Sequence, residues 1–121
     1  MIATIEDVRR IALALPGAVE LQDHGGNWFN VGRKTFVLFG SPSARWIFKL
    51  PKPLQELLFE ARPDVFQPFR MGAMLWSYVD VEQLDIDEIK SLVTDCWTQV
   101  VPKKVARAHT EAAGGAIKDH G

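Results

Sequence analysis

The stretch WFNVGRKTFVLFG, residues 28–40, decides the fold class of this chain. Two runs rich in β-branched and aromatic residues, 27–31 and 34–39, flank the pair Gly32-Arg33. Two residues between such runs are typical of a β-hairpin, and glycine in the first position favours a type II′ turn because that position needs a positive φ. The stretch therefore predicts two antiparallel strands joined by a tight turn.

Similar runs on both sides extend this hairpin into a sheet. Strand-like segments fill Val19 to Leu50, separated by glycine-containing turns at 25–26 and 40–43. Residues 44–50 alternate clearly between two faces, and residues 74–81 follow the same period. The pattern predicts an antiparallel meander, with which the segment at 74–81 is expected to pair.

Three longer stretches and one short one carry the signals of helices. They are residues 4–15, 53–61 and 85–100, and the short stretch 103–113. Thr4 with Asp7, and Asp85 with Glu88, have the spacing of capping boxes at helix N-termini. The order of helix, strands, helix, strand and helix predicts an α+β fold, with an antiparallel sheet packed against N-terminal and C-terminal helices.

The apolar pattern also predicts a core. The helix at 53–61 is expected to bury one stripe, made of Leu54, Leu57, Leu58 and Ala61. The tryptophans are expected in the core as well, because three alternate with polar neighbours in strands and the fourth lies on an apolar helix stripe. They are Trp28, Trp46, Trp76 and Trp97.

Composition places the chain among globular domains. Its 121 residues are 47% hydrophobic and 24% charged, and its formal net charge is −1. No apolar run approaches the roughly 20 residues that span a bilayer, and the single cysteine fits a reducing compartment. We expect one domain over residues 1–113, a flexible tail at 114–121, and a cytoplasmic protein, monomeric and without a membrane partner.

The titratable residues show no catalytic or metal-binding pattern. His24, His109 and His120 lack the spacing of a metal motif. Cys96 lies on the apolar stripe of a predicted helix, where cysteine usually behaves as a small buried hydrophobe. The acidic residues at 80–88 surround a predicted helix N-terminus, which stabilises negative charge. The sequence predicts no catalytic residue, no metal and no cofactor.

Charge is distributed unevenly along the chain. Residues 33–76 carry seven Lys or Arg and three Asp or Glu, a net charge of +4. Residues 77–100 carry one Lys and six Asp or Glu, a net charge of −5. Basic side chains at a hairpin tip and on a strand face are suited to a phosphate backbone. The candidate phosphate-binding residues are Arg33, Lys34, Arg45, Lys49 and Arg70.

The order of the segments carries a family resemblance. LALPGAVE follows the opening helix, WFNVGRKTFVLFG forms the hairpin, and PFRMGAMLWSYVDV precedes an acidic helix that ends in VVPKK. Over residues 8–104 the chain resembles the MmcQ/YjbR family. The resemblance implies a compact bacterial-type α+β domain whose "double wing" arrangement is likened to a DNA-binding motif.

Two functions remain open at this stage. The first is a non-catalytic DNA-binding module that contacts the duplex backbone through its basic sheet edge and hairpin wings. The second is a protein or small-ligand interaction module whose adaptable apolar surface includes Met71, Met74 and Leu75. Convergence of the five basic candidates on one face favours the first, and their scattering favours the second.

Overall fold

The computed structural model describes residues 4–23, 26–40 and 45–109, without the side chains of Asp23 and Met71. In chain order its elements are α1 (Ile5–Leu13), β1 (Ala18–Asp23), β2 (Gly26–Val31), β3 (Lys34–Gly40), β4 (Arg45–Phe48), α2 (Lys52–Ala61), β5 (Phe66–Met71), β6 (Met74–Val79), the short 3₁₀ helix η1 (Val81–Gln83) and α3 (Ile86–Thr98). Residues 103–109 are also helical. The remainder of the helix expected at 103–113, and the tail expected at 114–121, lie outside the described residues.

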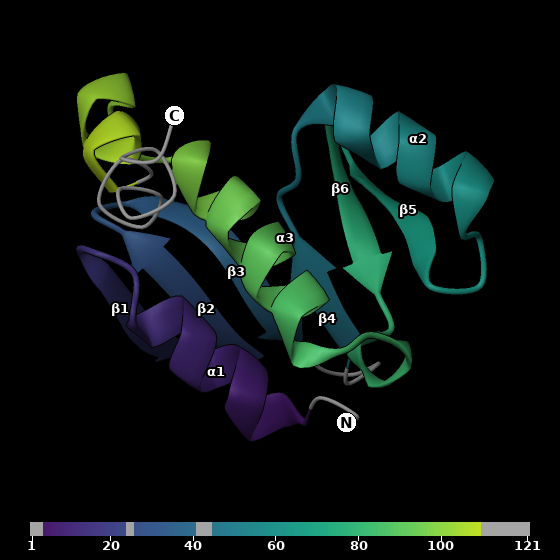
Figure 1. Cartoon of the computed structure of the whole chain (residues 1–121), viewed down its shortest axis with the longest axis horizontal. Helices are drawn as coiled ribbons and strands as arrows, with labels where there is room; N and C mark the ends of the chain where they lie inside the picture. Colours follow the sequence, from purple (N-terminus) through teal and green to yellow (C-terminus); the bar gives the residue numbers. More distant parts are fainter. Residues whose placement is uncertain (1–3, 24–25, 41–44, 110–121) are drawn as a thin grey trace, which may run out of the picture.

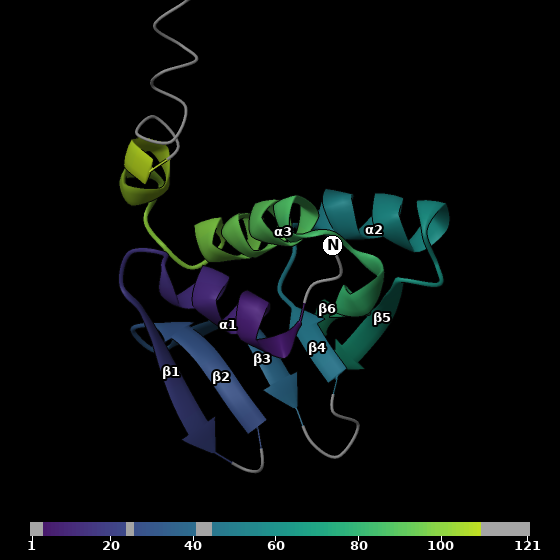
Figure 2. The same cartoon turned by 60° about the horizontal axis from the view of Figure 1, so that its bottom comes forward.

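The strands form one antiparallel sheet in the order β1-β2-β3-β4-β6-β5. The three helices α1, α2 and α3 lie on the same side of this sheet (Figures 1 and 2). The predicted α+β architecture, the meander and the pairing of 74–79 with it are therefore confirmed. None of the helices in the described ranges has the length and apolar character needed to cross a bilayer.

The core lies between the helices and one face of the sheet. Val8 and Ala12 of α1 and Ile89, Val93 and Trp97 of α3 are fully buried against the strands. Burial of each large apolar side chain stabilises the fold by roughly 1.5–3 kcal/mol. The indole Nε1 of Trp97 also donates a 2.9 Å hydrogen bond to the carbonyl of Pro16, which ties α3 to the segment between α1 and β1.

Both predicted capping boxes are present. The Thr4 hydroxyl accepts from the backbone N–H of Asp7, whose carboxylate accepts from the N–H of Thr4. Asp85 and Glu88 make the same reciprocal pair at the start of α3. Because these hydrogen bonds satisfy N–H groups that have no partner within the helix, the two boxes fix where α1 and α3 begin.

The predicted hairpin is confirmed, with Val31 paired to Lys34 across Gly32-Arg33 and Gly32 at φ 61°. A bulge interrupts the pairing, because the register passes from Phe29↔Val37 to Asn30↔Thr35. The extra residue, Phe36, is completely buried in the core beneath the helices. The bulge thus allows Phe36 and Val37, although adjacent in sequence, both to contribute to the same core.

Four residues predicted to lie in the interior do not lie there. On α2, Leu57 is 60% exposed and Ala61 is also exposed, whereas the polar residue Gln55 is buried. Trp28 and Trp76 are only half-buried, unlike Trp46 and Trp97. Their register shows why: each pairs with residues on the sheet face that points away from the helices.

Candidate nucleic-acid interface

Two tight turns project from the same end of the sheet. Gly32-Arg33 joins β2 to β3, and Gly72-Ala73 joins β5 to β6. Both glycines have φ 61°, and a Cβ at either position would meet nothing within 4 Å, so the turns are tight and open to solvent. Because all neighbouring strands are antiparallel, the two turns and the end of β4 share one end of the sheet. We call this end, residues 31–34, 49–52 and 70–74, the wing end.

Four of the five predicted phosphate-binding residues lie at the wing end. Arg33 and Lys34 lie at the first turn, and Arg70 lies beside the second. Lys49 stands between them, since its backbone N–H donates a 3.0 Å hydrogen bond to the carbonyl of Phe36 near the start of β3. Lys52, the first residue of α2, joins this group and was not among the predicted residues. Its position follows from the fold rather than from any local pattern.

A cleft of about 510 Å³ opens at the wing end between α2 and the β5–β6 hairpin. Three of the cations, Lys49, Lys52 and Arg70, line it, together with a single carboxylate, Glu56. Apolar side chains complete its walls, among them Phe59, Leu75 and Trp76. The excess of positive charge in a concave surface favours an anionic ligand, because low-dielectric walls strengthen the field inside.

The start of α2 adds to this field. Pro51 occupies the N-cap position without a side-chain hydrogen bond to the helix, and the first turn contains no acidic residue. The positive end of the helix dipole is therefore not neutralised by a carboxylate of that turn. It lies beside Lys52, one of the cations that line the cleft.

Arg45 is the exception among the predicted cations. It begins β4, at the end of the sheet opposite the wing end. Its guanidinium carbon stands 3.8 Å from the centre of the Tyr78 ring, and its NH2 group donates to the side-chain oxygen of Gln67. Neighbouring side chains therefore hold Arg45 on the sheet face that points away from the helices, and Arg45 does not belong to the cationic group.

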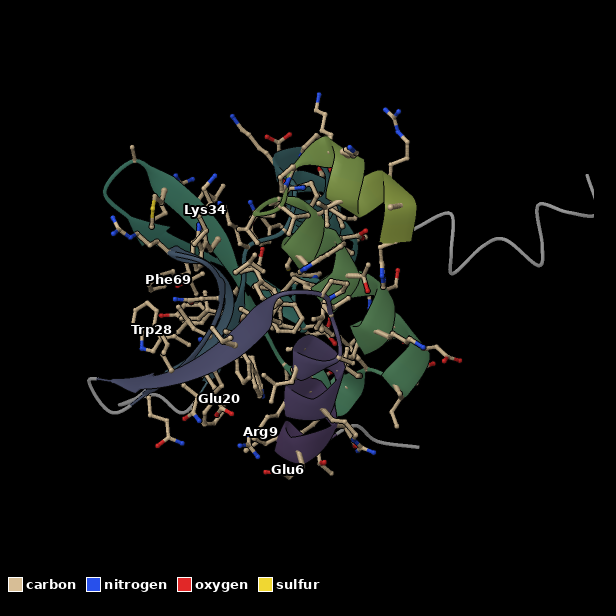
Figure 3. All side chains as sticks on the ribbon, turned by 90° about the vertical axis from the view of Figure 1, so that its left-hand side faces the viewer. Glu6, Arg9, Glu20, Trp28, Lys34 and Phe69 are labelled. Atoms are coloured by element: carbon tan, nitrogen blue, oxygen red, sulfur yellow. The ribbon has the colours of Figure 1, made fainter. Side chains whose placement is uncertain are left out.

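Acidic side chains gather at the opposite end of the molecule. Figure 3 shows Glu6 at the bottom of the molecule and Lys34 in its upper part. The start of α3 lies at the acidic end, where Asp85 caps the helix and Glu88 forms a 2.8 Å ion pair with Arg62. Hydrogen bonds from the backbone and hydroxyl of Thr4, and the nearby charge of Arg10, lower the pKa of Asp7 despite partial desolvation. The uneven charge of the sequence thus becomes a separation between two ends.

The residues predicted for an apolar interaction surface do not share one face. Met74 is 45% exposed and pairs with Met71 at the second turn. Leu75, the next residue, points to the other side of the strand and lines the cationic cleft. The side chain of Met71 is not among those that the structure describes. Met74 and Leu75 are therefore not parts of one continuous surface.

The described cysteine and histidine both pack against other side chains. Cys96 is completely buried, and desolvation together with the nearby Asp95 raises the pKa of its thiol well above the usual value. His109 makes an edge-on ring contact with Trp97, with centroids 4.9 Å apart. No group of three or more metal-ligating side chains occurs among the residues that the structure describes. His24 and His120 lie outside those residues.

Comparison with known proteins agrees with the architecture. Residues 13–99 match the family model described as YjbR. The chain belongs to the YjbR family. This YjbR domain is also similar to the crystal structure of Deinococcus radiodurans protein DR2400, a DUF419 domain, with a TM-score of 0.71 and 20% identity over 93% of this chain and 89% of that one. At this identity the likeness shows the fold. A search of curated proteins found no match.

Proposed function

We propose that this YjbR domain is a non-catalytic cytoplasmic module that binds the backbone of duplex DNA through its wing end. The observation that supports the proposal is that three separate segments each carry cations at the same end of the sheet. These cations are Arg33, Lys34, Lys49, Lys52 and Arg70. Each is a flexible cation that can pair with a phosphate, and together they offer roughly three to five simultaneous contacts.

The distribution of charge, rather than its total, supports this function. A net charge of −1 gives the chain no overall attraction for a polyanion. Separation of acidic and basic ends nevertheless orients the domain, because the wing end is attracted to phosphate while the end with Asp85 and Glu88 is repelled. Backbone contacts of this kind position a protein on DNA without reading sequence.

A salt titration tests the proposal. Binding of a labelled random duplex of about 20 base pairs is followed by fluorescence anisotropy, and log K is plotted against log salt. Three to five phosphate contacts give a slope of about −2.7 to −4.5. The variant Lys49→Gln/Lys52→Gln/Arg70→Gln should flatten the slope, while Lys90→Gln, an exposed cation on α3, should not. Absence of salt-dependent binding by the native chain would reject the proposal.

The cleft itself favours a second candidate function. A volume of about 510 Å³ lined by three cations is large enough for a small anionic ligand such as a nucleotide. One nucleotide would fill such a site. The affinity of an oligonucleotide for the site would therefore not rise with the length of the oligonucleotide. Titration with a mononucleotide and with oligonucleotides of increasing length separates the two functions, because only backbone binding strengthens as phosphates are added.

A further inference from the structure

The sheet face away from the helices, here called the open face, is largely apolar. One row crosses all six strands through consecutive paired residues. It consists of Leu21, Trp28, Leu38, Ile47, Tyr78 and Gln67. Leu38 and Ile47 in the centre are only 6% and 5% exposed, yet neither belongs to the core beneath the helices. Side chains of the open face itself therefore cover them.

Aromatic rings flank this centre. Phe69 on β5 pairs directly with Trp76 on β6, and its ring makes an edge-on contact with Tyr78 at a centroid distance of 5.1 Å. Trp28 on β2 belongs to the same face, and Figure 3 shows Trp28 and Phe69 on the side of the sheet away from the helices. All four rings are half-buried, so each retains some accessible surface.

The strands of the open face carry little charge that would repel a polyanion. Among its described side chains on the six strands there is one cation, Arg45, and no carboxylate; the others are apolar or carry no charge. Trp76 is common to the two regions, because it pairs with Phe69 on the open face and also lines the cationic cleft. A strand held by phosphate contacts in the cleft would reach the aromatic rings next.

We propose that the open face binds unstacked bases, so that the preferred ligand of this domain is single-stranded nucleic acid. Successive bases stack on aromatic side chains of a sheet in a sequence-tolerant way, and a groove of cations carries the backbone. A duplex cannot use the rings in this manner, because its base faces are already stacked on one another. The inference rests on the proposed function, since the wing-end cations supply the phosphate contacts.

Binding of labelled oligothymidylate, compared with a duplex of equal length, tests this inference. The native chain should bind the single strand more tightly. Phe69→Leu, which removes the ring but keeps an apolar side chain, should weaken single-strand binding by about 5- to 150-fold, the loss expected for one stacked base. Duplex binding and the melting temperature should change little, since Phe69 lies on an edge strand.

Two further variants control for the ring and for folding. Phe69→Tyr keeps a ring and should retain native single-strand affinity, and Leu57→Ala removes an exposed apolar side chain on α2 and should have no effect. Trp76→Leu compared with Trp76→Phe repeats the test at the paired position. If duplex binding is salt-dependent but the single strand binds no tighter and Phe69→Leu changes nothing, the inference fails alone. If neither nucleic acid binds, the proposed function fails with it.

Discussion

The hydroxyl of Ser77 on β6 donates a 2.6 Å hydrogen bond to the side-chain oxygen of Gln55 on α2, and both residues are buried. The amide nitrogen of Gln55 in turn donates a 2.9 Å hydrogen bond to the carbonyl of Leu75. Gln55 is thus buried on α2, whereas Leu57 of the predicted apolar stripe is exposed. Gln55 also ties α2 to β6, two elements that border the cationic cleft.

Breaking one side of this link should be costly. Gln55→Leu leaves the Ser77 hydroxyl buried without its acceptor, and we expect a loss of about 1–3 kcal/mol in the free energy of unfolding. Ser77→Ala in the same background removes the unsatisfied group and should recover part of that loss. Urea denaturation of both single variants and the double variant measures the coupling, and additive effects would contradict the expected interaction.

The sequence predicts α1 and α3 well because their signals are local. Thr4 with Asp7 and Asp85 with Glu88 form their hydrogen bonds within one helical turn, so spacing alone identifies them. The hairpin at Gly32 is predicted for the same reason, since turn geometry and flanking pattern lie within a few residues.

Other features depend on contacts that sequence spacing does not encode. Strand β5 was not predicted because Pro68 cannot donate a ladder hydrogen bond, and only its edge position makes that proline acceptable. Gln55 is buried because Ser77 happens to face it from a distant strand. The order of the strands in the sheet likewise decides which cations share an end, and it places Lys52 at the wing end and Arg45 at the opposite end.

The two tryptophans Trp97 and Trp76 should differ in their contribution to stability. Trp97→Ala removes a fully buried ring and its hydrogen bond to Pro16, so we expect a loss of about 3–5 kcal/mol. Trp76→Ala removes a half-buried ring from the open face and should cost only about 1 kcal/mol. Thermal or urea denaturation compares them. A loss at Trp76 as large as that at Trp97 would place its ring in the core and weaken the case for stacking.

An ion pair between α1 and β1 should make stability depend on pH. Glu20 accepts a 2.6 Å hydrogen bond from Arg9 and another from Asn27 (Figure 3 labels Glu6, Arg9 and Glu20). Burial raises the pKa of Glu20, but these two hydrogen bonds and the charge of Arg9 outweigh it and lower that pKa below 4.5. Because the pKa of Glu20 is lower in the folded chain than in the unfolded chain, its carboxylate stabilises the fold at every pH above the unfolded-state pKa. This contribution is lost as the pH falls through the folded-state pKa.

Glu20→Gln should therefore lower the free energy of unfolding at neutral pH by about 1–2 kcal/mol, and the difference from the native chain should vanish in strong acid. Glu6→Gln is the matched control, because Glu6 approaches the same Arg9 at 3.5 Å but its side chain is 76% exposed. Its effect should be small at every pH, since exposed ion pairs contribute little. Equal effects of the two substitutions, or a Glu20→Gln loss that persists in acid, would contradict this account.

The first turn, between β2 and β3, offers the most direct test of charge at the wing end. Arg33 and Lys34 are both exposed, and neither forms an ion pair in the described part of the chain. Arg33→Glu/Lys34→Glu should change the free energy of unfolding by less than about 0.5 kcal/mol for each substitution, as surface changes usually do. Duplex binding should nevertheless weaken on every sequence, and the magnitude of the salt slope should fall by up to about 1.8 because two backbone contacts are lost.

Lys90→Glu, one charge reversal outside the wing end, serves as the control for net charge. Equal loss of binding in this control would mean that overall charge, not the wing, attracts DNA, and an unchanged slope in the wing variant would show that the first hairpin does not touch the backbone.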